Sequence, residues 1–296
     1  MLQVGNTYYW YGMEYDGALT DKKFNGVMRL NAYTSTDLAH WSFASTLIQS
    51  DRTNTPGKPQ VGWYSNPDVL FNKATRTYVL NLAERHGQRN GVDFYTARSP
   101  LGPYTWHADK EVERPDGLHT MGNKRVFLDD DGQAYLLFVS DDGAPTHLNT
   151  NTKIALLTPD YLGIARVVSD CAGRGHEALS MLKHGRYYYI FSSQTRGWKS
   201  SPTSYKRATA LNAFSCTGGD DGHGWYRVPT TPSSTDSFNT QHRTEITVRG
   251  TDITTVVFTG DRWSQFDPTV GGVGRNDWYP LTFDTSGTPV LHGLHS

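Results

Sequence analysis

Short stretches that alternate apolar and polar residues recur along the chain, each after a Gly or polar turn. Five of them share a β-branched and aromatic run: VGNTYYWYG, KATRTYVLNL, DDGQAYLLFV, HGRYYYIFSS and RGTDITTVVFTG. Tyr8, Tyr78, Tyr135, Tyr188 and Ile253 mark one position in each, and the steps between them are 70, 57, 53 and 65 residues. Alternation bounded by turn residues predicts strands, and self-similarity at this period predicts one structural unit per repeat.

A second element follows most of these strands and predicts the fold class. It reads AYTSTDLAHWSF, FYTARSPLGPYTW, IALLTPDYLG and YKRATALNAF, a strand that leads into a Ser/Thr/Pro/Asp turn. Helical periodicity is hard to find. Four-stranded sheets repeated about every 60 residues without a helical crossover are typical of a β-propeller. We therefore expect an all-β chain in which residues 1–296 form a single five-bladed β-propeller domain. Two stacked sandwiches would not explain the shared period.

The repeat also predicts an incomplete first blade. Counting back from Tyr8 as in the other repeats reaches a position before Met1. The chain is therefore expected to begin partway along the innermost strand of a truncated first blade. If the two chain ends pair to close the propeller, the shortened blade leaves a strand edge, and such an edge favours pairing with a second copy as a homodimer.

Composition narrows the classes of partner. The formal charge of −1 gives no electrostatic footprint for nucleic acid or an anionic membrane. Aromatic residues make up 12% of the chain, and such rings often serve as flat surfaces for sugars. No apolar run reaches the ~18 residues of a membrane span, and no signal-peptide pattern is visible. Cys171 and Cys216 either pair, as in a secreted protein, or are two unrelated thiols.

Four polar positions fall 11 to 13 residues before the strand anchors. They are Ser65 with Asn66, then Asn123, Glu177 and Gln241. Innermost strands of a propeller line its channel, so these side chains are expected to converge at one mouth. A strand-end charge has no reason to keep register with three other polar positions, and we therefore interpret Glu177 as a site residue.

The ordered set TYYWYG, YTSTDLAHW, FLDDDGQAYLL, EALSMLKHGRYYYIFSS, TRGW, NTQ and FTGDRW resembles glycoside hydrolase family 43, in particular its group of exo-β-1,3-galactanases. The match runs from about Val4 to Phe283. The resemblance implies an exo-acting, inverting hydrolase that releases terminal galactose from β-1,3-galactan or arabinogalactan-type polysaccharide. We expect a secreted protein, with a cytoplasmic location as the alternative. An arabinofuranosidase or xylosidase of the same family, and a propeller that binds carbohydrate without cleaving it, remain as alternatives.

The resemblance also implies roles for two residues. Glu177 aligns with the general acid of the family, with Leu179 where a Pro usually follows Glu-Ala. Gln241 aligns with the Gln that orients the water in the galactanase-like group. Inverting hydrolysis requires the acid and the water-activating group to flank the sugar, ~6.5–9.5 Å apart. Burial in a largely apolar channel is expected to raise the pKa of Glu177.

Two departures from the family pattern predict altered activity. Asn123 stands where the relatives have the Asp of Ser-Arg-Asp, and Ser65-Asn66-Pro67 stands where they have Glu-Arg-Pro. Both changes remove negative charge, so the pKa of Glu177 is expected to be raised less and the sugar to lose charged acceptors. A different substrate or a weakened activity follows from this, as it does from the missing first strand.

Further candidates for sugar binding are Glu14 after WYGM, Trp198 in TRGW, and Asp261 in GDRW. Trp198 is a stacking platform or a core residue, and Asp261 contacts sugar or forms a structural ion pair with Arg262. Polar contacts to sugar are also expected from His119, His176 and His242.

The run Asp129–Asp131 before Gly132 is interpreted as a hairpin turn rather than a structural Ca²⁺ site. No zinc-ligand motif and no cofactor motif is found, so no cofactor is predicted, and a structural Ca²⁺ at this run remains the alternative.

Overall fold

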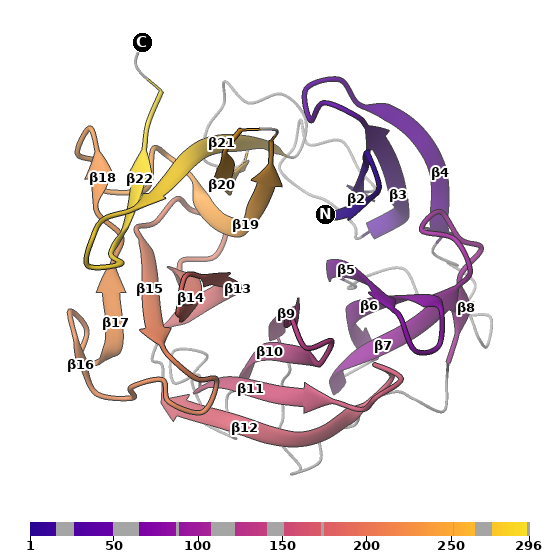
Figure 1. Cartoon of the computed structure of the whole chain (residues 1–296), viewed down its shortest axis with the longest axis horizontal. Helices are drawn as coiled ribbons and strands as arrows, with labels where there is room; N and C mark the ends of the chain where they lie inside the picture. The colour runs from indigo at the N-terminus through magenta and orange to yellow at the C-terminus, as the bar shows by residue number, and fades with distance from the viewer. Residues whose placement is uncertain are drawn as a thin grey trace. The chain divides into compact units, whose positions relative to one another are not determined.

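A computed structural model describes residues 1–15, 27–49, 65–86, 89–107, 122–140, 151–172, 175–250, 252–263 and 274–294. The chain divides into two compact units. The first comprises residues 1–18, 23–136 and 155–167, and the second comprises 19–22, 137–154 and 168–296. Within the sheets most neighbouring strands are antiparallel and follow one another along the sequence, and two short strands pair in parallel (Figure 1).

The described strands form five sheets. The first has the order β1 (Leu2–Val4), β2 (Thr7–Tyr15), β3 (Val27–Ser35), β4 (Ser42–Gln49). The second has the order β5 (Ser65–Asn72), β6 (Thr77–His86), β7 (Arg89–Ala97), β8 (Thr105–Trp106). The third has the order β12 (Ile164–Ala172), β11 (Asn151–Leu157), β10 (Ala134–Ser140), β9 (Gly122–Leu128).

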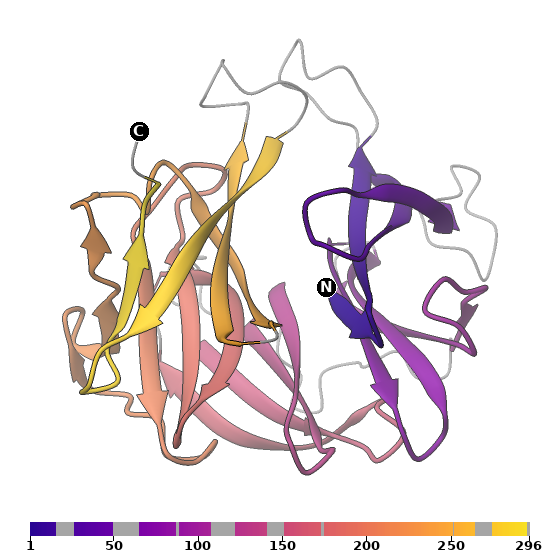
Figure 2. The same cartoon turned by 45° about the horizontal axis from the view of Figure 1, so that its top comes forward.

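The last two sheets have an additional short strand each. The fourth has the order β13 (His176–His184), β14 (Tyr187–Gln194), β15 (Thr203–Ala208), β17 (His223–Arg227), β16 (Gly218–Gly219). The fifth has the order β18 (Thr230–Thr231), β22 (Pro289–His292), β21 (Gly274–Phe283), β20 (Thr254–Trp263), β19 (Gln241–Arg249). Figures 1 and 2 show the long strands of the fifth sheet side by side in orange and yellow.

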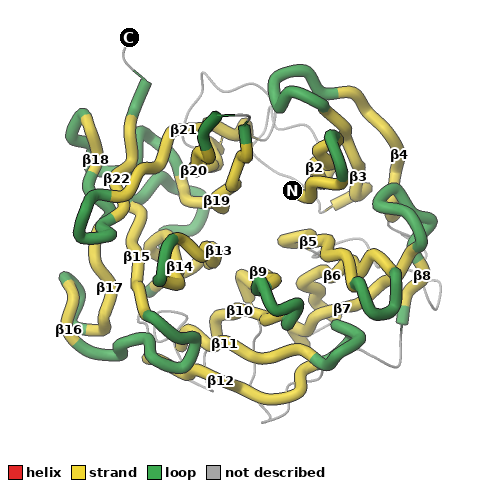
Figure 3. Tube along the Cα trace, viewed as in Figure 1, coloured by secondary structure: helices red, strands yellow, loops and turns green. Residues whose placement is uncertain are grey.

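Five successive meander sheets are the strand arrangement of a five-bladed β-propeller, so the predicted fold class is confirmed. The repeated aromatic runs become β2, β6, β10, β14 and β20, the second strand of each blade. The described residues contain strands and loops only (Figure 3), and none of them forms a helix able to cross a membrane.

The expected pairing of the two chain ends in one blade is wrong for the described strands. β1 pairs with β2 through Leu2–Tyr9, whereas β22 pairs with β21 and β18. The first blade therefore has an innermost strand of its own, three residues long. Whether the chain forms a homodimer stays a prediction.

The Asp129–Asp131 run makes the turn between β9 and β10, as predicted. Gly132 N–H donates to Asp129 O, and Gln133 N–H and Nε2 donate to the Asp131 carboxylate. These local hydrogen bonds close a tight hairpin, in which Gly132 adopts a φ of 82° that favours glycine.

Each unit has its own apolar core. Nine buried residues of the first two sheets pack together in the first unit, among them Leu30, Leu80 and Leu82. In the second unit, Tyr189 and Phe191 lie two residues apart on β14 and therefore share one face. Both belong to the buried cluster that contains Phe258 of β20. This packing of blade four on blade five holds the first strands of both blades together.

Cys171 and Cys216 form a disulfide with an S–S distance of 2.04 Å and a Cα–Cα distance of 5.0 Å. It joins the end of β12 to the loop before β16, so the pairing alternative left open by the sequence is the one the structure contains.

Removing this disulfide is expected to destabilise the fold. The bridge closes a 45-residue loop, and the chain-entropy model gives such a crosslink about 4 kcal/mol. We therefore expect the Cys171→Ser/Cys216→Ser double variant to unfold at a lower urea concentration than the wild type. The wild type measured after reduction by dithiothreitol is the matched control, and equal midpoints for oxidised and reduced protein would contradict the prediction.

Candidate active site

Glu177 and Gln241 contact each other at the start of two first strands in the second unit. Gln241 Nε2 donates to Glu177 Oε1 at 2.9 Å and to Gly197 O at 2.9 Å. Trp263 Nε1 donates to Gln241 Oε1, also at 2.9 Å. Both amide hydrogens therefore have an acceptor, and the indole, which can only donate, defines which end of the amide is the oxygen.

β-Bulges on both strands set this geometry. The pairing of β13 with β14 shifts between Glu177 and Ser180, and the pairing of β19 with β20 shifts between His242 and Thr244. Ala178, directly after Glu177, has a φ of 53°, in the left-handed region that a non-glycine residue adopts at a cost of ~1 kcal/mol or more. Bulges commonly redirect a side chain beside an active site, and here they present a carboxyl and an amide to each other.

Burial raises the pKa of Glu177 to about 7. Two hydrogen bonds act in the opposite direction, one from the backbone N–H of Arg196 and one from the Gln241 amide, but burial outweighs them. A carboxyl with this pKa is protonated in a useful fraction near neutrality, which a general acid requires. The prediction of a raised pKa from burial is confirmed.

A pocket of about 230 Å³ adjoins the pair. It is lined by Arg196, Trp198, Lys199, Ser200, Asn239, Asp261, Arg262 and Trp263. The Trp198 and Trp263 rings meet edge to face, with centroids 4.5 Å apart. Glu177 and Gln241 are not among the lining residues. Two lining residues contact them: Trp263 donates to the Gln241 amide, and Arg196 donates a backbone hydrogen bond to Glu177. Two Trp rings together with six polar or charged side chains suit a sugar.

The raised pKa of Glu177 has a consequence for stability. The folded chain binds this proton more tightly than the unfolded chain, so the group favours folding below about pH 4.5 and loses that contribution as the pH rises to about 7. Glu177→Gln removes the titration. We expect the variant to match the wild type near pH 4 and to exceed it near pH 8, by up to about 3 kcal/mol. Thermal unfolding at both pH values measures this, and a difference that stays constant with pH would contradict it.

His176 does not present its ring to the pocket side of the strand. Its side chain is buried, stacks on Trp225 with centroids 4.3 Å apart, and contacts Ser192 Oγ at 2.8 Å and Asp221 Oδ2 at 3.3 Å. Burial lowers the pKa of His176 to about 4, so the ring is neutral near pH 7. Neighbouring residues on a strand point to opposite faces, which places His176 in the sheet packing and leaves it little surface for a sugar.

Asn66 and Asn123 have the backbone conformation of Ala178, the residue after the acid, and do not occupy the position equivalent to Glu177 itself. Their φ values are 51° and 50°, close to the 53° of Ala178. Asn tolerates this left-handed conformation better than most residues, which gives both positions a local structural reason. Asn66 and Asn123 therefore correspond to the residue after Glu177 in β13.

The remaining candidates belong to three different sheets. Ser65 begins β5, opposite Ala83, and its side chain lies outside the described part. Glu14 accepts hydrogen bonds from Arg29 at 2.9 Å and Asn31 at 3.0 Å within the first sheet. Asp261 lines the pocket and accepts a hydrogen bond from Asn276.

The remaining predictions concern the ion pair of Arg262, the role of Trp198, and the contacts of His119 and His242. Arg262 pairs with Asp277 at 3.1 Å. Trp198 lines the pocket, which fits the stacking alternative. His119 lies outside the described residues. His242 is 1% exposed, so its expected direct contact with sugar is wrong.

Sequence reasoning missed a buried cluster behind the pair. Ser180, His242 and Glu245 form it, and the His242 and Glu245 side chains are fully buried. Residues 242 and 245 would face opposite sides of a regular strand, and only the bulge between them brings them together.

Comparisons with known proteins show the family and the fold. A family model described as glycosyl hydrolases family 43 matches residues 1–276. The exo-β-1,3-galactanase of Phanerochaete chrysosporium, solved with galactose, superposes with a TM-score of 0.76 at 28% identity, covering 98% of this chain and 61% of that one. The exo-β-1,3-galactanase of Clostridium thermocellum has a TM-score of 0.77 at 24% identity, covering 98% of this chain and 60% of that one, and supports the fold.

A curated relative has a different named activity. A non-reducing end α-L-arabinofuranosidase of Bacteroides ovatus is 26% identical over 189 residues, which are 60% of this chain and 32% of the relative. The chain thus spans about a third of that relative and about three fifths of the two galactanase chains. The family match extends over most of the sequence and includes both residues of the Glu177–Gln241 pair. The chain belongs to glycosyl hydrolases family 43.

Proposed function

We propose that the chain is an exo-acting, inverting glycoside hydrolase that removes a terminal sugar, galactose, from β-1,3-linked galactan. The observation that carries this is the Glu177 carboxyl, whose pKa burial raises to about 7 and whose partner Gln241 is held by Trp263 of the pocket. The proposal needs no metal and no cofactor.

Glu177 is assigned the role of general acid. As the bond between the sugar C1 and the leaving oxygen breaks, the Glu177 proton passes to that oxygen. A water oxygen bonds to C1 from the opposite face and loses a proton to solvent, and the Glu177 carboxylate regains one before the next turnover. A carboxyl held protonated by burial performs this step near neutral pH.

Gln241 is assigned to orient the water. Its Oε1 accepts one hydrogen bond from Trp263 and has a second lone pair for a water O–H. The direct 2.9 Å contact with Glu177 differs from the wider separation that we expected for an inverting pair. A sugar that enters between them must therefore displace the amide from the acid before the water is placed.

The choice of galactan rests on the resemblance to the galactanase group. One solved relative has galactose bound, and variants with its glutamate replaced by Ala or Gln were solved with β-1,3-galactotriose. Arabinofuranoside is the second candidate because the curated relative is named for it. The disulfide suits an oxidising compartment, and we propose that the protein is secreted.

The test is a substrate panel. β-1,3-Galactan, arabinan, arabinoxylan and the aryl glycosides of galactose, arabinofuranose and xylose are incubated with the wild type and with Glu177→Gln, and the released monosaccharide is quantified by chromatography. We expect galactose as the only sugar that the wild type releases, and far slower release from β-1,3-galactan by Glu177→Gln. Arabinose or xylose would replace the substrate assignment, and binding of galactose without release from any substrate would support a non-catalytic propeller.

A further inference from the structure

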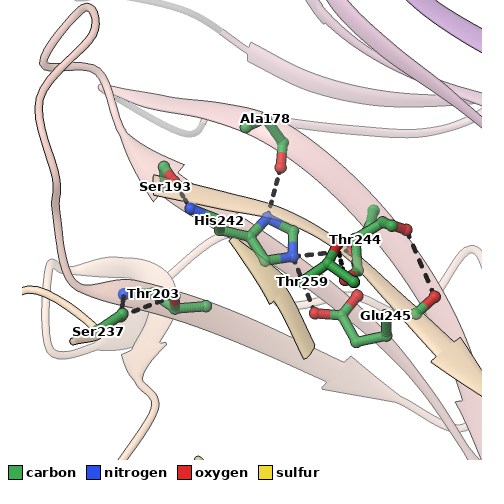
Figure 4. Close-up of polar contacts among 9 residues, drawn as sticks. Ala178, Ser193, Thr203, Ser237, His242, Thr244, Glu245 and Thr259 are labelled. Atoms are coloured by element: carbon green, nitrogen blue, oxygen red, sulfur yellow. Dashed lines mark hydrogen bonds and ion pairs between the residues drawn. The ribbon is translucent and has the colours of Figure 1, made fainter. Parts of the chain in front are cut away.

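His242, which forms a cluster with Ser180 and Glu245, directly follows Gln241 in the chain and contacts Ala178, which directly follows Glu177 (Figure 4). His242 Nδ1 contacts Ala178 O at 2.7 Å, and His242 Nε2 contacts Glu245 Oε1 at 2.8 Å. Ser180 Oγ lies 3.2 Å from the same Nε2 and donates to Glu245 Oε2. The imidazole packs between Phe191 and Phe258, with ring centroids 6.2 and 5.6 Å away.

The hydrogen-bond partners define where the protons lie. A backbone carbonyl only accepts, so His242 Nδ1 carries a hydrogen and donates it to Ala178 O. A second proton must lie between Nε2 and Glu245 Oε1, because two acceptors would otherwise face each other at 2.8 Å. Glu245 thus fixes the ring in an orientation in which Nδ1 is committed to the Ala178 carbonyl.

This orientation excludes a nucleophilic role for Ser180. In a Ser-His-acid triad, the acid holds Nδ1 and the serine faces Nε2. Here the acid and the serine share Nε2, Nδ1 is occupied by the backbone, and the His242 and Glu245 side chains are fully buried. No substrate reaches such a cluster, so its effect must pass through the backbone.

His242 makes two links from blade five to blade four. Its side chain binds the carbonyl of Ala178, the left-handed residue directly after Glu177. Its backbone N–H donates to Ser193 Oγ at 2.8 Å, and Ser193 is the β14 residue paired with Glu177. Both links lie at bulges, where the regular ladder is interrupted and does not itself hold the backbone.

We propose that His242, oriented by Glu245 and Ser180, is a positioning residue that fixes the backbone on which Glu177 and Gln241 are presented to the substrate. The inference rests on the proposed function for its kinetic meaning. The backbone of the acid is fixed by the Nδ1–H bond to Ala178 O, and the loss of this bond frees the left-handed residue to relax. The Glu177 carboxyl then moves relative to the amide and the sugar.

A matched pair of variants tests this in the Glu245→Gln background, which avoids an unpaired buried carboxylate. In His242→Asn the amide Nδ2 takes the place of Nδ1 and can still donate to Ala178 O. In His242→Gln the longer amide reaches toward Ser180 and residue 245 instead. Both replace the ring by an amide, so losses of packing are similar.

We expect the Asn variant to keep kcat within about threefold of the background and the Gln variant to lose tenfold or more, because about 1 Å of misplacement can cost about 10²-fold. KM should change little in either. Ser193→Ala, which removes only the backbone link, should also lower kcat. Thermal unfolding establishes that every variant is folded.

A measurement without substrate tests this proposal independently of the proposed function. The titration of the Glu177 carboxyl, followed by ¹³C NMR and identified by its absence in Glu177→Gln, should be the same in the background and the Asn variant but shifted in the Gln variant. Titration and kcat that are equal in the two variants would overturn the proposal and leave the cluster a stability role. If no substrate is cleaved by the wild type, the titration still decides.

Discussion

Glu177→Gln is expected to lower kcat on β-1,3-galactan by about 10³-fold, because the leaving oxygen then departs without a proton. Positioned acids contribute roughly 10²–10⁴-fold, and an alcohol is a poor leaving group. The wild-type rate should also fall as the pH rises through about 7, where the buried carboxyl ionises. Steady-state rates across pH 5 to 9 measure both effects.

The leaving group provides the control for this prediction. The leaving group of a 2,4-dinitrophenyl glycoside departs as a stable phenolate and needs little protonation. Glu177→Gln should therefore retain most of the wild-type rate on this substrate. A variant that is equally impaired on the activated and the natural substrate would show that Glu177 binds or positions the sugar and is not the acid.

Gln241→Leu is expected to lower kcat by about 10²-fold, the second-largest effect, since the water loses the amide oxygen that orients it. Leu keeps the approximate volume without a polar atom. The substitution also removes the hydrogen bond that Gln241 donates to Glu177. Because this bond lowers the pKa of Glu177, its loss should raise that pKa further. The pH profile of kcat/KM reports the second effect separately.

The two effects distinguish the possible roles of Gln241. The Gln241 amide could act only by holding Glu177, as its 2.9 Å contact would allow. In that case Gln241→Leu should have the wild-type kcat at a pH where Glu177 is protonated in both proteins. A loss of kcat that persists at low pH indicates a role in placing the water. Gln241→Glu is the matched variant of the same length, and its second carboxylate beside Glu177 should move the pH profile further still.

Strand repeats made the fold predictable from the sequence, because aromatic and β-branched residues mark the second strand of every blade. The same count placed Ser65, Glu177 and Gln241 at or next to the first residue of β5, β13 and β19. Local pattern was sufficient here because each repeat folds as one meander.

The bulges limited what the sequence could show. A regular strand would place His242 and Glu245 on opposite faces, as it would Glu177 and Ser180, and one extra residue in each strand reverses this. The sequence also left undecided whether Cys171 and Cys216 pair, since two cysteines 45 residues apart carry no pairing signal of their own. The direct contact between acid and amide depends on the packing of two blades, which no local pattern encodes.

The most direct test of the account is the configuration of the first sugar that the wild type releases from a β-linked galactoside. We would follow the anomeric proton by NMR during the first minutes, before mutarotation, with Glu177→Gln as the control. Inversion with Glu177 as acid predicts α-galactose first, and none from the variant. Initial release of β-galactose, or α-galactose from both proteins, would contradict the account.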